Sequence, residues 1–401
     1  MPTAETNPAA GGLVDINYVA ESEFGSTPAS ATFKGYPNRR TTLNVGKDTF
    51  RSEVRSASRQ RKHSKHGYKN IGGDIMSELA SQWHDDFLEA LLGGTWASVT
   101  NSTVLASGSI QPGGSKLQSA SAAFITEGFK VGDIFTLAVG ANDANSGIRH
   151  QIASITETEI EVYGSTLVAT TIASINVRGV GKKVAVGNSV RSFSIERFFS
   201  NLGLYQLFKG MRVNSGHFTV QPNGIIGLDF NFMGQDADAL TSTKAGSAYT
   251  SAPTSEPMAT IFGSLYEGTT KTELALITGF DLTLTNNMTG DKVLFRNTTP
   301  AINFGRFHDV SGTLTLLFNG PTQYNKFLNE TETTFDIVVY DGSNQNTAGF
   351  IRLHMERVKF NTGDLDDSAE TSIPMTVGFE SLEPTGTSGR ETRAIVIQRS
   401  N

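Results

Sequence analysis

The stretch 72–96, GGDIMSELASQWHDDFLEALLGGTW, places a strand pattern directly before a helix pattern. Its first part, GGDIMSEL (72–79), alternates polar and apolar residues, which is typical of a strand with one buried face. In SQWHDDFLEALLGG (81–94), acids near the start suit the helix dipole and the closing glycines suit a C-terminal cap. We therefore predict a strand and then a short amphipathic helix. The predicted core face of that helix consists of Trp83, Phe87, Leu88 and Leu91.

The same order of elements occurs again later in the chain. The strand pattern SGTLTLLF (311–318) precedes the helix pattern PTQYNKFLNE (321–330), which carries a Phe-Leu pair like that of the first helix. Three later stretches also correspond in order: FSIERFF (193–199) to FDIVVYD (335–341), GMRVNSGHFTV (210–220) to MERVKFNTGDL (355–365), and GIIGLDFNFMG (224–234) to SIPMTVGFESL (372–382). Each half thus predicts strand, helix, strand, strand, strand. We interpret this as a duplicated β domain; the alternative is the strand and turn statistics that all β domains share.

Three further segments differ from these halves in composition. Residues 98–188 are rich in Ser, Thr, Ala and Gly with short strand patterns, and they predict an inserted small β domain. Residues 1–30 are small and polar, and predict an arm that orders only on contact. Residues 236–260 predict a polar linker or long loop. The predicted fold class is mainly β.

Positive charge is concentrated in one part of the chain. The formal net charge is −6, yet residues 39–69 hold ten Lys or Arg against Asp48 and Glu53. The remainder holds 23 basic and 37 acidic residues, a net charge of −14. Such asymmetry indicates contact with an acidic partner, for which a second copy of the chain qualifies.

The sequence contains no convincing catalytic or metal site. The absence of Cys excludes disulfides, thiol catalysis and Cys-ligated zinc. His63 and His66 have metal-like spacing but lie in a cationic stretch, and GVGKK (179–183) does not complete a phosphate loop. DLDD (364–367) and QDAD (235–238) lack the spacing of a calcium loop. We expect no enzyme activity, metal or cofactor.

Three stretches together carry a family resemblance: YVAESEFGSTPAS (18–30), RSEVRSASRQRKHSKHGYKN (51–70) and the opening stretch 72–96. In this order they resemble the major tail tube proteins of long-tailed, non-contractile bacteriophages. The resemblance covers about 13–97 and 190–401. The insert resembles accessory β domains that decorate some of these tails.

The resemblance implies two tandem β-sandwich or barrel domains, each with one short helix, plus the insert. The first tube domain would comprise 31–97 and 189–235, and the second 261–401. Three chains would close a pseudo-hexameric ring, because two similar domains can occupy quasi-equivalent positions. Stacked rings would enclose the tape-measure protein and later the DNA, with other tail proteins at the tube ends.

The same resemblance implies a place in the virion tail after synthesis in the host cytoplasm. The N-terminal sequence lacks the basic and apolar regions of a signal peptide. No apolar run reaches the roughly 20 residues of a membrane helix, so we expect no membrane insertion. A tail-fibre or baseplate protein that binds the host surface is the alternative function.

The basic stretch has three interpretations: direct DNA binding, a solvated loop, or a clamp onto an acidic surface of the next ring. It contains only one aromatic residue, Tyr68, so its capacity to stack on bases is small. We favour the clamp, since a related loop reaches the neighbouring ring in the resembled family. The predicted inter-ring residues are Arg51, Arg55, Arg59, Arg61, Lys62, Lys65 and Lys69.

Polar positions on the predicted strands are candidates for the lumen. If strand phase is as predicted, Asp74, Glu78 and Asp229 face away from the core, and a slip of one residue would reverse this. Acids there would repel DNA phosphates.

Overall fold

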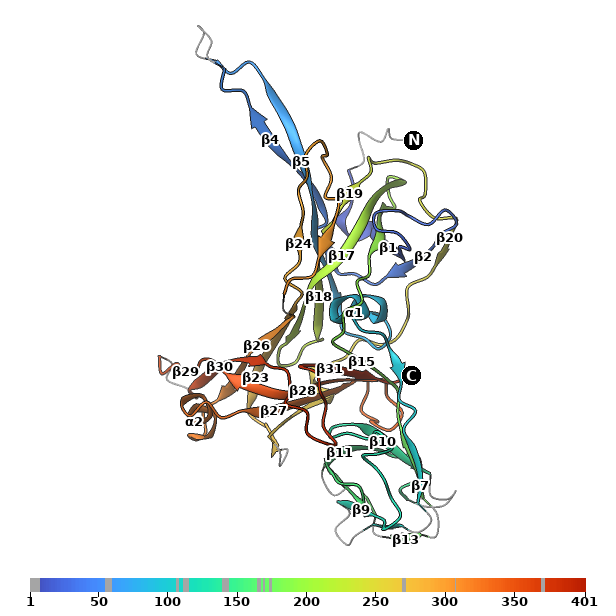
Figure 1. The fold of residues 1–401 in the computed structure, drawn as a ribbon, viewed down its shortest axis with the longest axis vertical. Coiled ribbons are helices and arrows are strands. Elements are labelled where there is room, and N and C mark those ends of the chain that lie inside the picture. The colour runs from blue at the N-terminus through green and yellow to red at the C-terminus, as the bar shows by residue number, and fades with distance from the viewer. Residues whose placement is uncertain are drawn as a thin grey trace.

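The computed structural model describes residues 8–54, 60–105, 108–110, 115–138, 144–163, 167–168, 170–172, 175–268, 272–306, 308–368 and 372–401. Within these residues the protein is mainly β, as predicted, with short 3₁₀ helices η2 (Gly11–Leu13) and η3 (Thr260–Phe262) and α-helices α1 (Asp85–Leu92) and α2 (Thr322–Leu328). The molecule is elongated, with a long hairpin at one end and the inserted domain at the other (Figure 1).

The first half of the chain forms a sheet that packs against α1. Its strands are β1 (Val14–Ala20), β2 (Thr32–Tyr36), β3 (Arg40–Thr41), β4 (Asn44–Arg51), β5 (Ser64–Glu78), β16 (Phe193–Phe199), β17 (Leu204–Val220), β18 (Gly227–Gly234), β19 (Asp236–Ala237) and β20 (Ala248–Thr250). They pair in the order β4–β5–β18–β17–β16–β1–β2. On β18, Phe230 and Phe232 are buried, whereas Asp229 and Asn231 are half-exposed. This alternation is what gives the sheet one apolar and one polar face.

Helix α1 is anchored by its apolar face. Asp85 and Asp86 occupy its first turn, and Gly93 ends it in the left-handed conformation with φ of 64°. The buried residues of the helix are Phe87, Leu88, Ala90, Leu91 and Leu92. Trp83 differs from the other residues of the predicted core face, because it precedes the helix and is only half-buried.

The second half repeats the strand order of the first. Its strands are β21 (Gly263–Glu267), β22 (Thr272–Glu273), β23 (Ile277–Thr285), β24 (Thr289–Gly290), β25 (Ile302–Asn303), β26 (Asp309–Leu317), β27 (Thr333–Tyr340), β28 (Phe350–Phe360), β29 (Asp364–Leu365), β30 (Pro374–Ser381) and β31 (Val396–Arg399). The main strands pair in the order β23–β26–β30–β28–β27–β21. Thus β4, β5, β18, β17, β16 and β1 correspond in position to β23, β26, β30, β28, β27 and β21.

The inserted domain forms a sheet of its own, with the order β13–β8–β9–β12–β11–β10–β14–β7. The bounds are β7 (Ser102–Leu105), β8 (Gly108–Ile110), β9 (Lys116–Gln118), β10 (Ile134–Ala138), β11 (Arg149–Ile155), β12 (Glu159–Val162), β13 (Thr170–Ile172) and β14 (Ile175–Gly179). Its separate core includes Phe124, Phe129 and Phe135. The predicted end of the insert at 188 is wrong, because β15 (Lys182–Ala185) pairs with β31 and with β6 (Ala97–Ser98) outside this sheet.

Two other predicted segments also differ from the structure. Residues 14–20 do not form an arm: as β1 they pair with β16 along their whole length, and they bury Ile16 and Tyr18. Residues 1–7 of the predicted arm lie outside the described residues. The predicted linker 236–260 is a long loop that packs on the first half, where it includes β19 and β20 and ends near buried Met258.

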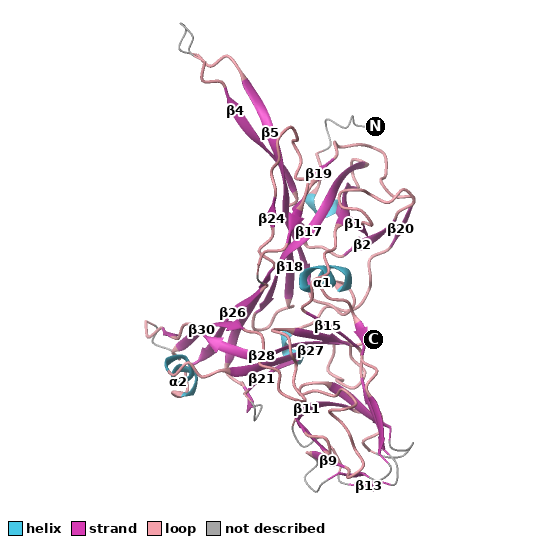
Figure 2. Ribbon diagram, in the orientation of Figure 1, coloured by secondary structure: helices cyan, strands magenta, loops and turns pink. Residues whose placement is uncertain are grey.

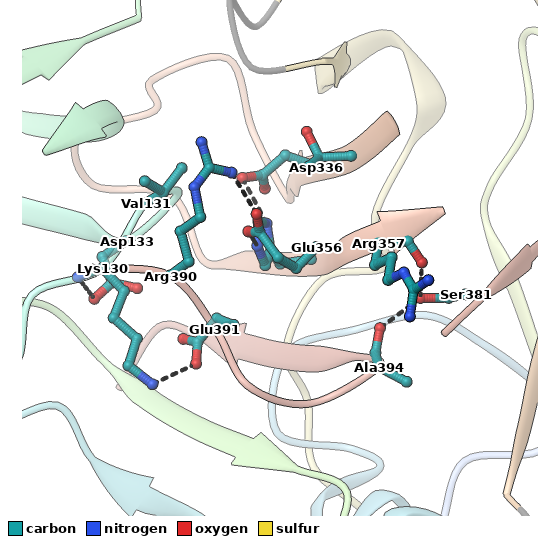
Figure 3. A network of polar contacts seen from close by, with 12 residues as sticks. Lys130, Val131, Asp133, Asp336, Glu356, Arg357, Ser381, Arg390, Glu391 and Ala394 are labelled. Atoms are coloured by element: carbon teal, nitrogen blue, oxygen red, sulfur yellow. Dashed lines mark hydrogen bonds and ion pairs between the residues drawn. The ribbon is translucent and has the colours of Figure 1, made fainter. Parts of the chain in front are cut away.

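A network of buried charges attaches the insert to the second half (Figure 3). Arg352 is fully buried and donates two hydrogen bonds to Asp336, from Nε at 2.7 Å and from Nη2 at 3.0 Å. From the insert, Asp133 approaches Arg352 and pairs with Lys183 of β15. Removing one partner of such a buried pair is strongly destabilising, so this network fixes the position of the insert.

Glu391 also belongs to this network of charges. It accepts from Lys130 at 2.7 Å and lies 3.1 Å from the Nζ of Lys183. Burial alone would raise the pKa of Glu391, but the two lysines outweigh burial and lower that pKa to about 2. The carboxylate is therefore charged at neutral pH.

Candidate assembly surfaces

The solvent side of the main sheet brings the predicted lumen candidates together. On β5, Asp74 and Glu78 flank Met76, and Met76 lies opposite Asp229 of β18. Residues directly opposite in an antiparallel pair point to the same face, so the three acids share one face. The same row continues across both halves through His217, Thr283, Ser311 and Glu380.

We term this surface the acidic face. Its acids are Asp74, Glu78, Asp229, Asp281 and Glu380. Asp74 accepts from the amide of Asn231 at 2.7 Å, which holds its carboxylate against the sheet. Arg39, at the edge of the sheet, reaches Asp229 at 3.4 Å. Hydroxyl side chains from β17, β23 and β26 also lie on this face, so the surface is polar.

The predicted inter-ring stretch lies on the long hairpin formed by β4 and β5. We term residues 44–54 and 60–69 the basic arm; they project away from the body of the molecule (Figure 2). Arg51 ends β4, Lys65 lies on β5, and Arg61 and Lys62 lie between the strands; all four are exposed. The predicted residues Arg55 and Arg59 lie outside the described residues.

Lys69 differs from the other cations of the basic arm. It lies at the base of the hairpin and forms an ion pair with Asp236 of the same chain, with both side chains largely covered. Asp48, which also lies at the base of the hairpin, accepts hydrogen bonds from Lys292 and from the side-chain amide of Asn70. Both contacts lower the pKa of Asp48. Lys69 and Asp48 at the base of the arm are thus paired within the chain, and the exposed cations Arg51, Arg61, Lys62 and Lys65 lie further out along the hairpin.

A pairing of two long strands joins the two halves of the main sheet. Ser215–Val220 of β17 pair antiparallel with Phe280–Thr285 of β23, and we term this pairing the seam. It makes the acidic face continuous between the halves.

A family model described as phage tail tube protein matches residues 11–385. The chain belongs to the phage tail tube protein family. No curated protein matches it. As a member of this family it is a structural component of the virion tail.

Other motifs singled out in the sequence have structural roles in this tail tube protein. Of QDAD, Asp236 pairs with Lys69 and Asp238 with Lys209. Of GVGKK, Lys183 belongs to the buried network. Among the described residues no group of three His, Asp or Glu could hold a metal ion, and no helix is long and apolar enough to cross a membrane.

Sequence reasoning did not find two surfaces of the tail tube protein. The seam was missed because the pairing of β17 with β23 is a long-range contact that no local pattern encodes. The second is a loop with exposed Val293, Leu294 and Phe295. Its signal was present in the sequence, since an apolar run flanked by Lys292 and Arg296 is unusual in a polar turn.

Proposed function

We propose that three copies of this chain close into a ring of six similar halves, and that rings stack into the tail tube through which DNA is delivered. Membership of the tail tube family supports the tube. The seam supports the ring, because it is a strand pairing that already joins two halves with the same strand order. The sequence resemblance supports a tail of the siphophage type.

The seam joins one edge of the first half to one edge of the second half. In each half, the edge that corresponds to the other half's seam strand is open among the described residues. In the first half, β3 and β4 stand where β23 stands in the second, and both pair only with β5 among the described residues. In the second half, β29 continues β28 and stands where the end of β17 stands. Within the described chain β29 pairs only with β30. Open edges favour pairing with another strand, and a heterologous joint that closes forms a ring.

The strand register of the seam indicates which residue at the edge of the second half corresponds to Thr219 of the first half. In the first half Glu78, Gly227 and Thr219 lie in one row across the sheet. The corresponding row of the second half runs from Leu317 through Pro374 to Asp366, whose amide bonds the Pro374 carbonyl. Asp366 therefore stands where Thr219 stands.

The register can be carried to the first half's edge in the same way. In the seam, Thr219 lies opposite Asp281, which in turn pairs with Thr313. Asp74 is the first-half counterpart of Thr313, and the amide of Thr42 bonds its carbonyl. Repeating the seam between chains thus puts Asp366 opposite Thr42 of the next copy.

This register brings opposite charges together. Arg40 lies diagonally across from Asp366 on the acidic face, with Arg39 and Asp367 one residue further along each strand. All four side chains are exposed in the single chain. Each such pair is worth only about 0.2–1 kcal/mol, so the charges select which edges meet while the backbone ladder and apolar burial hold the ring.

In this arrangement the acidic face lines the lumen. Fixed carboxylates there repel DNA phosphates, so DNA passes without binding. The basic arm, which projects from the ring body, contacts the acidic surface of the next ring. Its cations lie away from the acidic face, and this separation favours the clamp over direct DNA binding.

Negative-stain electron microscopy of the purified protein tests the function. We expect rings and stacked tubes at high protein concentration. Isolated particles that bind bacterial surface glycans would contradict the proposal and support the tail-fibre alternative.

A further inference from the structure

The segment between β23 and β26 exposes a strongly apolar tip. We term residues 291–297 the apolar loop. Leu294 is 82% exposed and Phe295 is 102% exposed, and Phe295 adopts a left-handed φ of 65°. Val293 beside them is 42% exposed. Large exposed apolar groups of this kind mark interaction sites.

Contacts with the base of the basic arm hold the apolar loop in place. The Tyr68 hydroxyl contacts the backbone of Val293, and the amide of Lys69 donates to the carbonyl of Asn297 at 2.8 Å. Lys292 pairs with Asp48 at 3.0 Å. These contacts tie both sides of the loop to the base of the basic arm, so its tip is presented in a fixed position.

A matching apolar cavity lies at the other end of β23. Its volume is about 330 Å³. Its apolar lining comes from the end of β17 and the turn after it, from η3, from β21, and from the segment between β22 and the start of β23: Val220, Pro222, Ile261, Leu265, Leu274 and Ile277. Ile261 at its edge is 67% exposed, and nearby Leu276 is 42% exposed. The apolar surface therefore continues out of the cavity onto the surface around it.

The tip and the cavity lie toward opposite ends of β23. The apolar loop leaves β23 beyond Thr285, whereas the cavity contains Ile277 at the strand's other end. Nine residues of strand span about 30 Å at roughly 3.3 Å per residue. Figure 1 shows β24, next to the loop, well above β23 and β27. Copies stacked head to tail would bring one tip to the next cavity.

We propose that the Leu294–Phe295 tip of one copy inserts into this cavity of a second copy in the adjacent ring. The inference rests on the proposed stacking of rings, and it names a contact separate from the basic arm. The cavity is large enough, because a cavity of about 150 Å³ already holds a benzene molecule. Charge also agrees: Arg296 beside the tip is basic, and Glu273 lines the cavity.

Cysteine cross-linking tests this contact, because the chain contains no Cys of its own. The variant carries Phe295→Cys on the tip and Ala275→Cys in the cavity lining, and is assembled and then oxidised. We expect a ladder of covalent multimers on a non-reducing gel. The matched control, Phe295→Cys with Val104→Cys on the exposed surface of the insert, should give no ladder.

A second variant separates this inference from the proposed function. With Leu294→Ser and Phe295→Ser, we expect rings of normal size but at least a tenfold loss of tube length. Tubes of normal length from this variant, or tubes without a ladder from the Cys pair, would overturn the inserted tip while leaving the tube function intact. Isolated particles from the unmodified protein would overturn both.

Discussion

The two halves of the chain pair their strands in the same order but differ in the segments that connect those strands. In the first half the hairpin of β4 and β5 forms the long basic arm, whereas the second half has the apolar loop between β23 and β26. Helix α1 buries five residues, whereas no residue of α2 is fully buried. Sheet pairing is constrained by neighbours on both sides, while connections vary freely. The shared sheet thus suits a repeated joint, and the differing connections suit contacts between rings.

The largest expected effect on ring assembly comes from the open edges, which the comparison treats as a copy of the seam. Arg39→Asp with Arg40→Asp places acids against Asp366 and Asp367, and like charges that face each other destabilise strand pairing. We expect about a tenfold or larger loss of rings, measured by size-exclusion chromatography with light scattering.

The compensating variant makes this test specific. Adding Asp366→Arg and Asp367→Arg to the reversed edge should restore rings. Failure of this four-residue exchange to restore them, with each variant folded by circular dichroism, would contradict the register carried over from the seam.

Substitutions in the two helices test whether α1 contributes more to stability than α2, as the burial of their side chains indicates. Phe87→Ala should lower the free energy of unfolding by about 3–5 kcal/mol, because Phe87 is 1% exposed in the core. Phe327→Ala at the corresponding place in α2 should cost less than about 2 kcal/mol, since its side chain is only partly buried. Urea unfolding measures both, and equal losses would argue against this contrast.

The basic arm should act between rings and not within them. Charge reversal with Arg51→Glu, Arg61→Glu, Lys62→Glu and Lys65→Glu should leave the amount of rings unchanged while shortening tubes in micrographs. In the control, Arg51→Lys with Arg61→Lys keeps the charge and should keep tube length. Long, salt-resistant tubes from the reversed variant would show that the clamp is not needed.

The smallest effect is a difference in acid sensitivity between regions. Burial lowers the pKa of His84, beside α1, from 6.5 to about 4. The unfolded chain therefore binds this proton first, and the first half loses stability as pH falls from 6.5 toward 4. Glu391 has a lowered pKa, so its stabilisation persists until pH falls below its usual value near 4.5 and is lost toward 2.

Thermal melts between pH 7 and pH 4.5 measure this difference. The variant His84→Gln cannot titrate at this position, so its melting temperature should fall less across the interval. An identical fall in the variant and the unmodified chain would assign the acid sensitivity to other groups.

The sequence predicted what local patterns determine. The alternation in GGDIMSEL and GIIGLDFNFM gave the correct strand phase, and through it the common face of Asp74 and Asp229. The helix was predicted from spacing and capping, although Trp83 lies before its first turn. Long-range pairing was not predicted: β1 was taken for an arm and β15 for part of the insert, because only their distant partners β16 and β31 make them strands of the main sheet.

The charged surfaces were predicted in part. The charge asymmetry located the basic arm, but only the structure revealed that Lys69 is neutralised by Asp236. The spacing of DLDD (364–367) argued against a calcium loop, but it gave no indication that this stretch contains the short strand β29. Edges and cavities arise from the packing of distant segments, which composition does not encode.

The mass of isolated rings tests most directly whether the seam is repeated between chains. Native mass spectrometry of rings should give about 129 kDa, three times the 43.0 kDa of one chain. A ring of six chains, or a population of single chains at high concentration, would contradict the closure of three chains through the open edges of β3 and β29.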